Sequence, residues 1–303
     1  MPVHWQCANT GTDLVTLFRK HMMTRAILKS PRILRSGQPL TLAGINQVCP
    51  AVFAPAAAPS RGPRYRYVPT IEPVQLLLNN GWGIYEASQQ RSRAADKDPY
   101  TKHMLRLRLL KDFDAGNYLK GDGVPEVILI NAHDGTAAYH LKAGFFRFVC
   151  SNGLMVGKQV TGITVRHTVG PQTSAEVIDA ATRIVTESFP HMLENIDLFK
   201  GIVLQPGQAY RLAQTALDLR FANTLAPITA QQLLTVRRVE DEAPTLWNVL
   251  NVVQENAVYG GLESTSAGFG RRQTMRPVER VSAVSRINAG IWDAASALAV
   301  ECA

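Results

Sequence analysis

The sequence predicts an α+β fold, in which an antiparallel sheet with a hairpin packs against helices and the C-terminal half is helical. The segment HMLRLRLL (103–110) alternates with the period of a strand. In residues 124–141, apolar runs flank an Asp-Gly pair, as they do in a β-hairpin. After Gly170-Pro171, apolar residues recur at three- and four-residue spacing, which is typical of helices. Strand signals before helix signals favour α+β architecture over alternating βαβ units.

The first 63 residues are expected to form an N-terminal extension and a linker. Residues 12–23 (TDLVTLFRKHMM) have the apolar spacing of a short helix. Residues 51–63 (AVFAPAAAPSRGP) contain several prolines among alanines, and proline cannot continue a helix. We therefore expect a single α+β domain that begins near Arg64 and extends to residue 303.

The first elements of this domain follow from local patterns. RYRYVPT (64–70) alternates basic and aromatic residues and predicts a strand, whereas residues 71–81 have helical spacing that ends at Gly81. A further strand is predicted over 82–93. In the strand 103–110, alternation separates two faces, one with Met104, Arg106 and Arg108 and the other with Leu105, Leu107 and Leu109.

The hairpin and the helices come next. Asp134-Gly135 supplies the positive φ angles of a two-residue hairpin turn. Strand signals continue through GFFRFVC (144–150) and KQVTGITVRHTV (158–169). Helical spacing then predicts four helices, over residues 174–200, 206–222, 229–238 and 245–261.

The tail begins with a basic, Gly/Ser-rich loop over residues 260–286 and ends in a helix predicted over 287–300. Such a loop can bury little surface by itself, so we expect it to become ordered against a partner chain or a polyanion. Its arginines are Arg271, Arg272, Arg276, Arg280 and Arg286.

The composition is that of a globular protein with excess positive charge. Of 303 residues, 46% are hydrophobic and 18% are charged, and 32 Lys and Arg against 24 Asp and Glu give a net charge of +8. Such a balance attracts phosphate-bearing partners. The N-terminus lacks a signal pattern and no apolar run reaches about 18 residues, so we expect a cytoplasmic protein without a membrane partner. The four scattered cysteines suit free thiols in a reducing compartment, and they are Cys7, Cys49, Cys150 and Cys302.

Cations and aromatic residues are interleaved between Arg61 and Lys111, where ten Lys and Arg face four Asp and Glu. Single-stranded nucleic acid is held by cations along its backbone and by aromatic faces on which bases stack. The predicted phosphate contacts are Arg64, Arg66, Lys102, Arg106, Arg108 and Arg147, with Arg271, Arg272 and Arg276 in the tail, and the stacking candidates are Tyr65, Tyr67 and Tyr100. The alternative is structural: tyrosines that pack the sheet against its helices, solvated arginines, and an Arg147 that pairs with Glu126 or Asp134.

An enzymatic site is weakly supported. Cys150 could act as a thiol nucleophile near His133, Asp134 and His140, but such groups must converge in space and most buried cysteines are inert. The two histidines and Asp134 could hold a divalent ion, yet the turn already explains the aspartate. No glycine-rich phosphate loop is present. We expect no catalytic residue, no metal and no cofactor.

Several blocks together resemble a known family: YVPT, TKHMLRLR, PEVILINAHDG, FFRFVCSNGL, LRF and LWNVLNVVQENAVYGGL. From about Arg64 to the C-terminus, the chain resembles the "phage/plasmid-like protein" family of conjugative plasmids and prophages, domain of unknown function 932. The resemblance implies a mobile genetic element and no assigned activity. The order of strands, hairpin and helices is also similar in topology to single-strand annealing recombination proteins, which form rings on single-stranded DNA; likeness of fold alone does not carry function.

The sequence thus predicts a DNA-binding protein of a mobile element that binds single-stranded DNA, with annealing or recombination as the further hypothesis. The expected assembly is a homo-oligomer, with a ring as one form. Two alternatives stay open. One is an anti-defence or regulatory protein that binds a host protein, and the other is a nuclease or thiol hydrolase.

Overall fold

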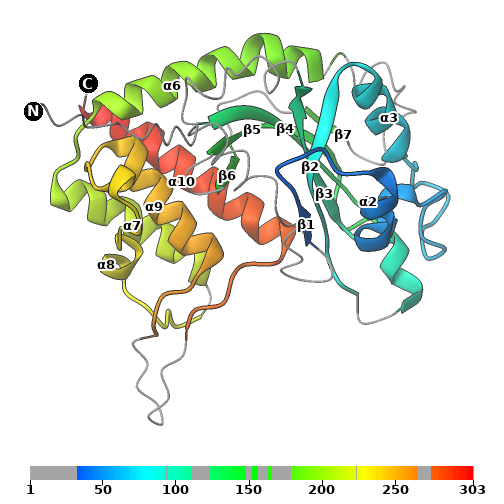
Figure 1. Cartoon of the computed structure of the whole chain (residues 1–303). Coiled ribbons are helices and arrows are strands. Elements are labelled where there is room, and N and C mark those ends of the chain that lie inside the picture. Colours follow the sequence, from blue (N-terminus) through cyan, green and yellow to red (C-terminus); the bar gives the residue numbers. More distant parts are fainter. Residues whose placement is uncertain are drawn as a thin grey trace, which may run out of the picture.

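A computed structural model of the whole chain describes residues 33–92, 95–110, 123–147, 152–155, 163–165, 179, 181–222, 224–264 and 274–302. It confirms the α+β fold, with a seven-stranded antiparallel sheet in these residues and a helical C-terminal half (Figure 1). The strands are β1 (Ile33–Arg35), β2 (Trp82–Gln89), β3 (His103–Leu109), β4 (Gly123–Asn131), β5 (Tyr139–Arg147), β6 (Asn152–Met155) and β7 (Ile163–Val165).

The sheet is a meander, with each strand from β1 to β6 antiparallel to the one before it. The strand order is β1-β2-β3-β4-β5-β6, and β7 pairs with β5 as well. The outer edge of β5 is therefore shared, because β6 pairs with residues 144–147 and β7 pairs with residues 139–141. The register shifts once, between Ile84 and Glu86 of β2, which is a β-bulge.

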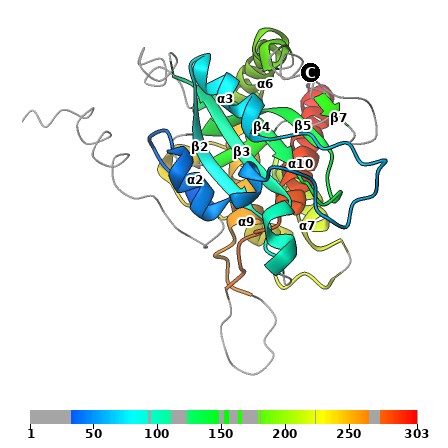
Figure 2. The same ribbon diagram turned by 90° about the vertical axis from the view of Figure 1, so that its right-hand side faces the viewer.

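Helices pack at both ends of the strand order. α2 contacts β1 and β2, α3 contacts β2, and α9 and α10 pack beside β6, where they also contact α7 (Figures 1 and 2). None of the helices in the described residues is both long and apolar enough to cross a membrane. The helical elements are α2 (Leu42–Val48), η1 (Pro50–Phe53), α3 (Ile71–Asn79), η2 (Ala95–Tyr100), η4 (Ile184–Ser188), α6 (Phe189–Gly201), α7 (Pro206–Phe221), α8 (Ala230–Leu233), η5 (Val239–Asp241), α9 (Leu246–Tyr259) and α10 (Val281–Cys302).

The main hydrophobic core lies on one face of the sheet. The leucines of β3, Leu105 and Leu107, join it as their alternation predicted, and so do Val127 and Leu129 of β4. Residues of α2, α3, α6, α7, α9 and α10 complete the same core. On the opposite face a small second cluster forms from Met104, Ile128 and Ile130 with Val281 and Val284 of α10. The start of α10 thus covers part of the second face.

The fold begins well before Arg64, which corrects the expected domain boundary. β1 forms the edge of the sheet and pairs with β2 from Ile33↔Ser88 to Arg35↔Glu86. Ile45 in α2 is fully buried in the main core. The proline-rich segment was rightly excluded from long helices, but it is anchored, because the amide of Ala58 donates to the carbonyl of His133 at 2.9 Å. The predicted helix at 12–23 lies outside the described residues.

Two local predictions were wrong. Residues 64–70 form no strand, although their basic and aromatic residues alternate. The β4–β5 connection is not a two-residue turn, because β4 ends at Asn131 and β5 begins at Tyr139. Gly135 does adopt a positive φ of 78° within this loop. The carboxylate of Asp134 accepts bonds from Thr136, which is an Asx turn inside a longer connection.

The helical half follows the predicted periodicity, with three changes. The helix predicted over 174–200 contains a π-helical turn, η4, before α6 begins. The helix predicted over 229–238 is only α8, four residues long. α9 begins where Thr245 caps it, since its hydroxyl accepts from the amide of Asn248. α10 begins at Val281, before the predicted start at Ile287.

Truncating Ile45 should destabilise the whole domain. Ile45→Ala removes a fully buried side chain from the main core, and we expect a loss of about 2–5 kcal/mol in the free energy of unfolding. Urea denaturation measures this, with Gln47→Ala as the matched control because Gln47 is exposed on the same helix. Equal stability of the two variants would show that α2 is not part of the cooperative fold.

Candidate nucleic-acid interface

The second face of the sheet carries a row of residues across five strands, and four of the five are charged. The pairing registers place Arg35, Glu86, Arg106, Ile128 and Lys142 side by side in this order, one from each of β1 to β5. Opposite charges therefore alternate in the first three positions. Directly opposed side chains of this kind stabilise a sheet.

Arg106 and Arg108 do lie on one face of β3, but that face is interior. The two side chains are 2% and 3% exposed. Both guanidinium groups bind the carboxylate of Glu126, which is fully buried; the Nε of Arg108 lies 2.7 Å from Oε1. Arg108 also lies between the rings of Tyr85 and Phe146, at 4.4 and 3.6 Å from their centroids. These contacts conflict with the phosphate role predicted for the two arginines, because neither is presented to solvent.

Arg147 is also an interior cation. Its guanidinium binds the carboxylate of Asp241, and both side chains are buried. The sequence predicted, as the structural alternative, that Arg147 pairs with a carboxylate, either Glu126 or Asp134. The partner is a carboxylate, but it is Asp241. Arg147 thus ties the end of β5 to η5 in the helical half, and it is not placed to contact a phosphate.

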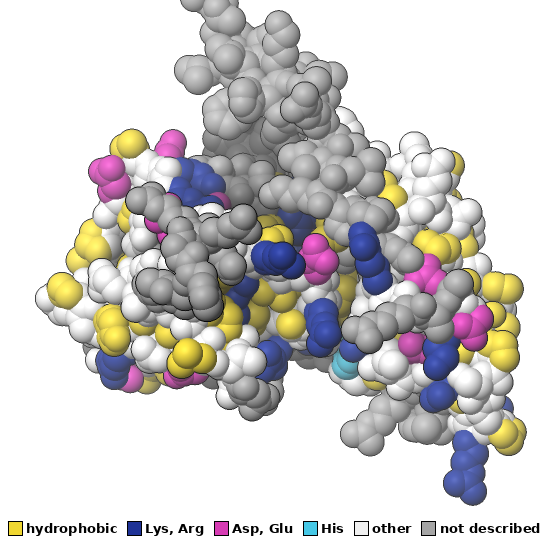
Figure 3. All heavy atoms as spheres, turned by 90° about the horizontal axis from the view of Figure 1, so that it is seen from below, with side chains coloured by type: hydrophobic (Ala, Val, Ile, Leu, Met, Phe, Trp, Pro, Cys, Tyr) yellow, Lys and Arg dark blue, Asp and Glu magenta, His cyan; other side chains and the backbone are white. Residues whose placement is uncertain are grey.

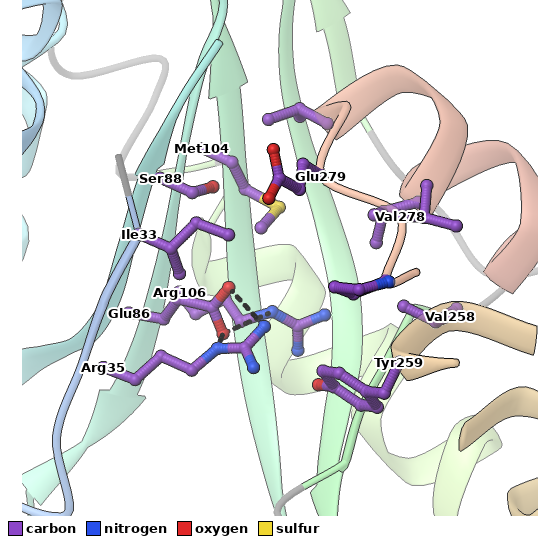
Figure 4. Close-up of a pocket in the computed structure, with 13 residues that line it drawn as sticks. Ile33, Arg35, Glu86, Ser88, Met104, Arg106, Val258, Tyr259, Val278 and Glu279 are labelled. Atoms are coloured by element: carbon purple, nitrogen blue, oxygen red, sulfur yellow. Dashed lines mark hydrogen bonds and ion pairs between the residues drawn. The ribbon is translucent and has the colours of Figure 1, made fainter. Parts of the chain in front are cut away.

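A small pocket opens beside the charged row (Figure 4). Arg35 and Arg106 reach Glu86 from its two sides, the first through a 2.8 Å ion pair and the second at 3.8 Å. Burial disfavours a charged carboxylate, but these two arginines outweigh it and hold the pKa of Glu86 below its usual range. The pocket volume of about 60 Å³ leaves room for a few water molecules and excludes a nucleotide.

A second group of predicted residues gathers at one end of the sheet, and we call Arg61, Arg64, Tyr65, Arg66, Tyr67, Tyr100 and Lys102 the loop surface. Three connections meet there. The hydroxyl of Tyr65 donates to the carbonyl of Ala132 at 2.9 Å, and the amide of His133 donates to the carbonyl of Tyr100 at 2.9 Å. Backbone contacts therefore hold residues 58–67, 95–102 and 132–136 together.

The cations of the loop surface are presented to solvent. Arg61, Arg64 and Arg66 are exposed and Lys102 is half-buried. Neither Arg64 nor Lys102 forms an ion pair with any described residue. These positions include three that the sequence predicted for phosphate contacts.

The tyrosines of the loop surface have a structural task as well. Tyr65, Tyr67 and Tyr100 are half-buried, and the hydroxyl of Tyr67 binds the carbonyl of Ala54 while its ring packs against His133 at 5.1 Å. Burial is the main reason that the pKa of Tyr65 and that of Tyr67 rise to about 12. The rings of Tyr65 and Tyr67 are thus fixed in orientation, which suits a stacking platform but is explained by packing alone.

A buried polar cluster lies beneath this surface. The hydroxyl of Thr70 lies 2.8 Å from Nε2 of His103 and 3.4 Å from Nε2 of His133. The Nδ1 of His103 lies 3.0 Å from the carbonyl of Thr101. Full burial lowers the pKa of His103 to about 4, so its ring is neutral at pH 7.

These positions separate the residues considered for an enzymatic site. His133 is fully buried in the cluster, whereas Nδ1 of His140 bonds the hydroxyl of Thr164 at 2.9 Å across β5 and β7. Within the part of the chain that the structure describes, no group of His, Cys, Asp and Glu is suited to hold a metal ion. Cys150 and Cys7 lie outside the described residues, and Cys49 is buried in the main core.

The basic tail is only partly described. Arg276, Arg280 and Arg286 are exposed, whereas Arg271 and Arg272 lie outside the described residues. Sequence reasoning missed Glu86 and Glu126 as the partners of the interior arginines. A signal was present, since each is a lone carboxylate within an apolar strand, and a buried carboxylate needs a cation.

Comparisons with known proteins identify relatives over most of the chain. Residues 58–292 match the family model described as "Domain of unknown function (DUF932)". Two curated Escherichia coli (strain K12) proteins, UPF0380 protein YafZ and UPF0380 protein YfjQ, are each 35% identical over 266 residues, which cover 88% of this chain and 94% of theirs. No solved structure matches.

Removing the charge of Glu126 should be costly. Glu126→Gln leaves two buried guanidinium groups without their carboxylate, and we expect a loss of about 3–5 kcal/mol in the free energy of unfolding. Glu187→Gln is the control, since Glu187 is exposed on η4. If both variants unfold at the same urea concentration as the wild type, the interior arginines do not depend on Glu126.

His103 should make the protein sensitive to acid well above pH 4. The pKa of about 4 in the folded chain lies below the value of about 6.5 in the unfolded chain, so between these values the unfolded chain binds more protons. Stability is complete above about pH 6.5 and falls towards pH 4 by up to about 1.4 kcal/mol per pH unit.

Urea denaturation at pH 7, 6 and 5 measures this slope. His103→Gln should flatten it, whereas His191→Gln should not, because His191 is exposed on α6. Parallel pH profiles for the wild type and His103→Gln would show that the acid sensitivity arises elsewhere.

Proposed function

The chain belongs to the DUF932 family, whose description names no activity, and we propose from its surface geometry that it binds nucleic acid, with single-stranded DNA preferred. The observation that carries this proposal is the loop surface. Connections far apart in the sequence converge there and present exposed cations beside oriented tyrosines. Cations on a strand's phosphates and aromatic faces under its bases are the two contacts that hold single-stranded nucleic acid.

The charge distribution supports the loop surface over the strand β3. Arg106 and Arg108 are buried and paired with Glu126, whereas Arg64 and Lys102 form no ion pair with a described carboxylate. An exposed cation can exchange its counterions for phosphates, which is the main source of nucleic-acid affinity. A buried, paired arginine cannot do so without losing its partner.

The proposal extends from binding single-stranded DNA to self-association and to the annealing of complementary strands. A homo-oligomer of a mobile element's protein would place several loop surfaces along one strand and thereby bring complementary strands together. Light scattering with and without an oligonucleotide measures the assembly, and the rate at which two labelled complementary strands pair measures annealing. A monomer in both conditions would confine the function to binding.

Loss of the exposed cations should weaken binding strongly. The variant Arg64→Ala/Arg66→Ala/Lys102→Ala should bind a labelled single-stranded oligonucleotide at least about tenfold more weakly. The slope of log K against log salt should also become shallower by about 2, because each lost phosphate contact removes about 0.7. Fluorescence anisotropy across a salt series measures both quantities.

The control variant removes the same charge elsewhere. The control changes three exposed cations to Ala: Arg183 just before η4, Lys200 on α6 and Arg211 on α7. Its affinity for the oligonucleotide should stay close to that of the wild type. A wild type that fails to bind single- or double-stranded DNA at low salt would refute the proposal. That result would direct attention to the alternatives of a host-protein ligand or an enzymatic reaction.

A further inference from the structure

Three arginines, Arg220, Arg237 and Arg276, lie around the C-terminal end of α9, and Arg280 follows on the returning chain just before α10; we call these four the α9-end cluster. α9 ends at Tyr259, and the chain reverses through Gly260 and Gly261, which have φ angles of 71° and 82°. A side chain at Gly260 would clash with the carbonyl oxygen of Met275, so the reversal requires glycine. Two backbone bonds between Met275 and residues 261 and 262 then bring the tail back alongside α9.

The buried side of this cluster is oriented by backbone carbonyls. Arg220 donates to the carbonyls of Ala257 and Arg276, and Arg237 donates to the carbonyl of Gly260 at 2.6 Å. Free carbonyls and the negative end of the helix dipole both favour cations at a helix C-terminus. The guanidinium groups of Arg220 and Arg237 are therefore held in place by the backbone.

Ion pairs do not hold the arginines of the α9-end cluster in place. None of its four arginines forms an ion pair with a described residue. The interior and linking arginines behave differently, since Arg106, Arg108 and Arg147 are all paired, and Arg238 binds Glu255 through two bonds at 2.6 and 2.7 Å. Burial lowers the pKa of Arg220 to about 10, which leaves it charged at pH 7.

The cluster lies on one accessible side of the molecule. Arg237, Arg276 and Arg280 are exposed, and Arg35 lies beside them with its guanidinium 5.1 Å from the ring of Tyr259. Figure 3 shows the molecule from below, where Lys and Arg side chains lie around the middle of the view together with hydrophobic side chains and an acidic one. The acidic residues of this turn are Glu263 and Glu279.

We propose that the α9-end cluster is a second contact surface for the phosphodiester backbone of nucleic acid. The inference rests on the proposed function and names a part of the molecule that carries it. All four cations are arginines, whose planar fork of donors matches a phosphate in two bonds. Because backbone carbonyls already orient Arg220 and Arg237, less side-chain entropy is lost when a phosphate binds.

The variant Arg237→Ala/Arg276→Ala/Arg280→Ala tests the inference in the full chain. It leaves Arg220 in place, because Arg220 joins α7 to the end of α9. We expect at least about tenfold weaker binding of a single-stranded oligonucleotide and a salt slope shallower by about 2. The Arg183/Lys200/Arg211 variant is the charge-matched control. A variant with Lys at the three substituted positions, 237, 276 and 280, should regain part of the affinity.

The outcomes separate this inference from the proposed function. If the wild type does not bind DNA, both are wrong. A second outcome is that the wild type binds DNA and the loop-surface variant loses affinity, but the α9-end variant binds as tightly as the wild type. In that case the proposed function stands and only the role of the α9-end cluster is wrong. If the Ala variant fails to unfold cooperatively, the decision passes to the single variant Arg280→Ala, whose unchanged affinity and salt slope would overturn the inference. Equal competition by polyglutamate of the same total charge would also overturn it, in favour of an acidic protein partner.

Discussion

Two guanidinium groups share one buried carboxylate on the second face of the sheet, and much of the architecture is arranged around this contact. Taking a carboxylate and an arginine out of water costs several kcal/mol for each ion. Here the cost is offset by ion pairs to Glu126, by the second carboxylate at Glu86 and by two aromatic rings against Arg108. Four strands must be in register for these groups to meet, so the contact requires β2 to β5 to be paired correctly.

Two groups among the described arginines differ in their surroundings. Those that link strands or join the sheet to η5 are buried and matched by carboxylates, so their charge is not seen from outside. Those on the connecting loops and around α9 are held by backbone or reach into solvent, and they contribute positive field at the surface. Net charge alone does not reveal this division. A surface that attracts phosphates is defined by which cations lack a carboxylate, not by how many cations the chain contains.

The sequence was informative where structure depends on local periodicity. The alternation around Leu105 and Leu107 predicted both the strand and its core-facing side, and the spacing in residues 206–221 and 246–259 predicted α7 and α9. It was uninformative where a distant partner decides. The burial of Arg106 depends on Glu126 of the neighbouring strand, and β1 is a three-residue strand recognisable only from its pairing with β2. Of the candidate site, the phosphate contacts of Arg64 and Lys102 stay a prediction, whereas the backbone contacts that orient Arg220 and Arg237 could be seen only in the structure.

The margins of the sheet bear on how copies of this protein could meet. β1 and β7 have three residues each and β6 has four, so each marginal strand offers few backbone groups to an incoming strand. β6 and β7 together occupy both ends of the outer edge of β5. Short edge strands are one means by which proteins avoid templating aggregation. A homo-oligomer of this protein would therefore be expected to assemble through helices or loops, and its sheets would stay separate, which also protects the chain against fibrous growth at high concentration.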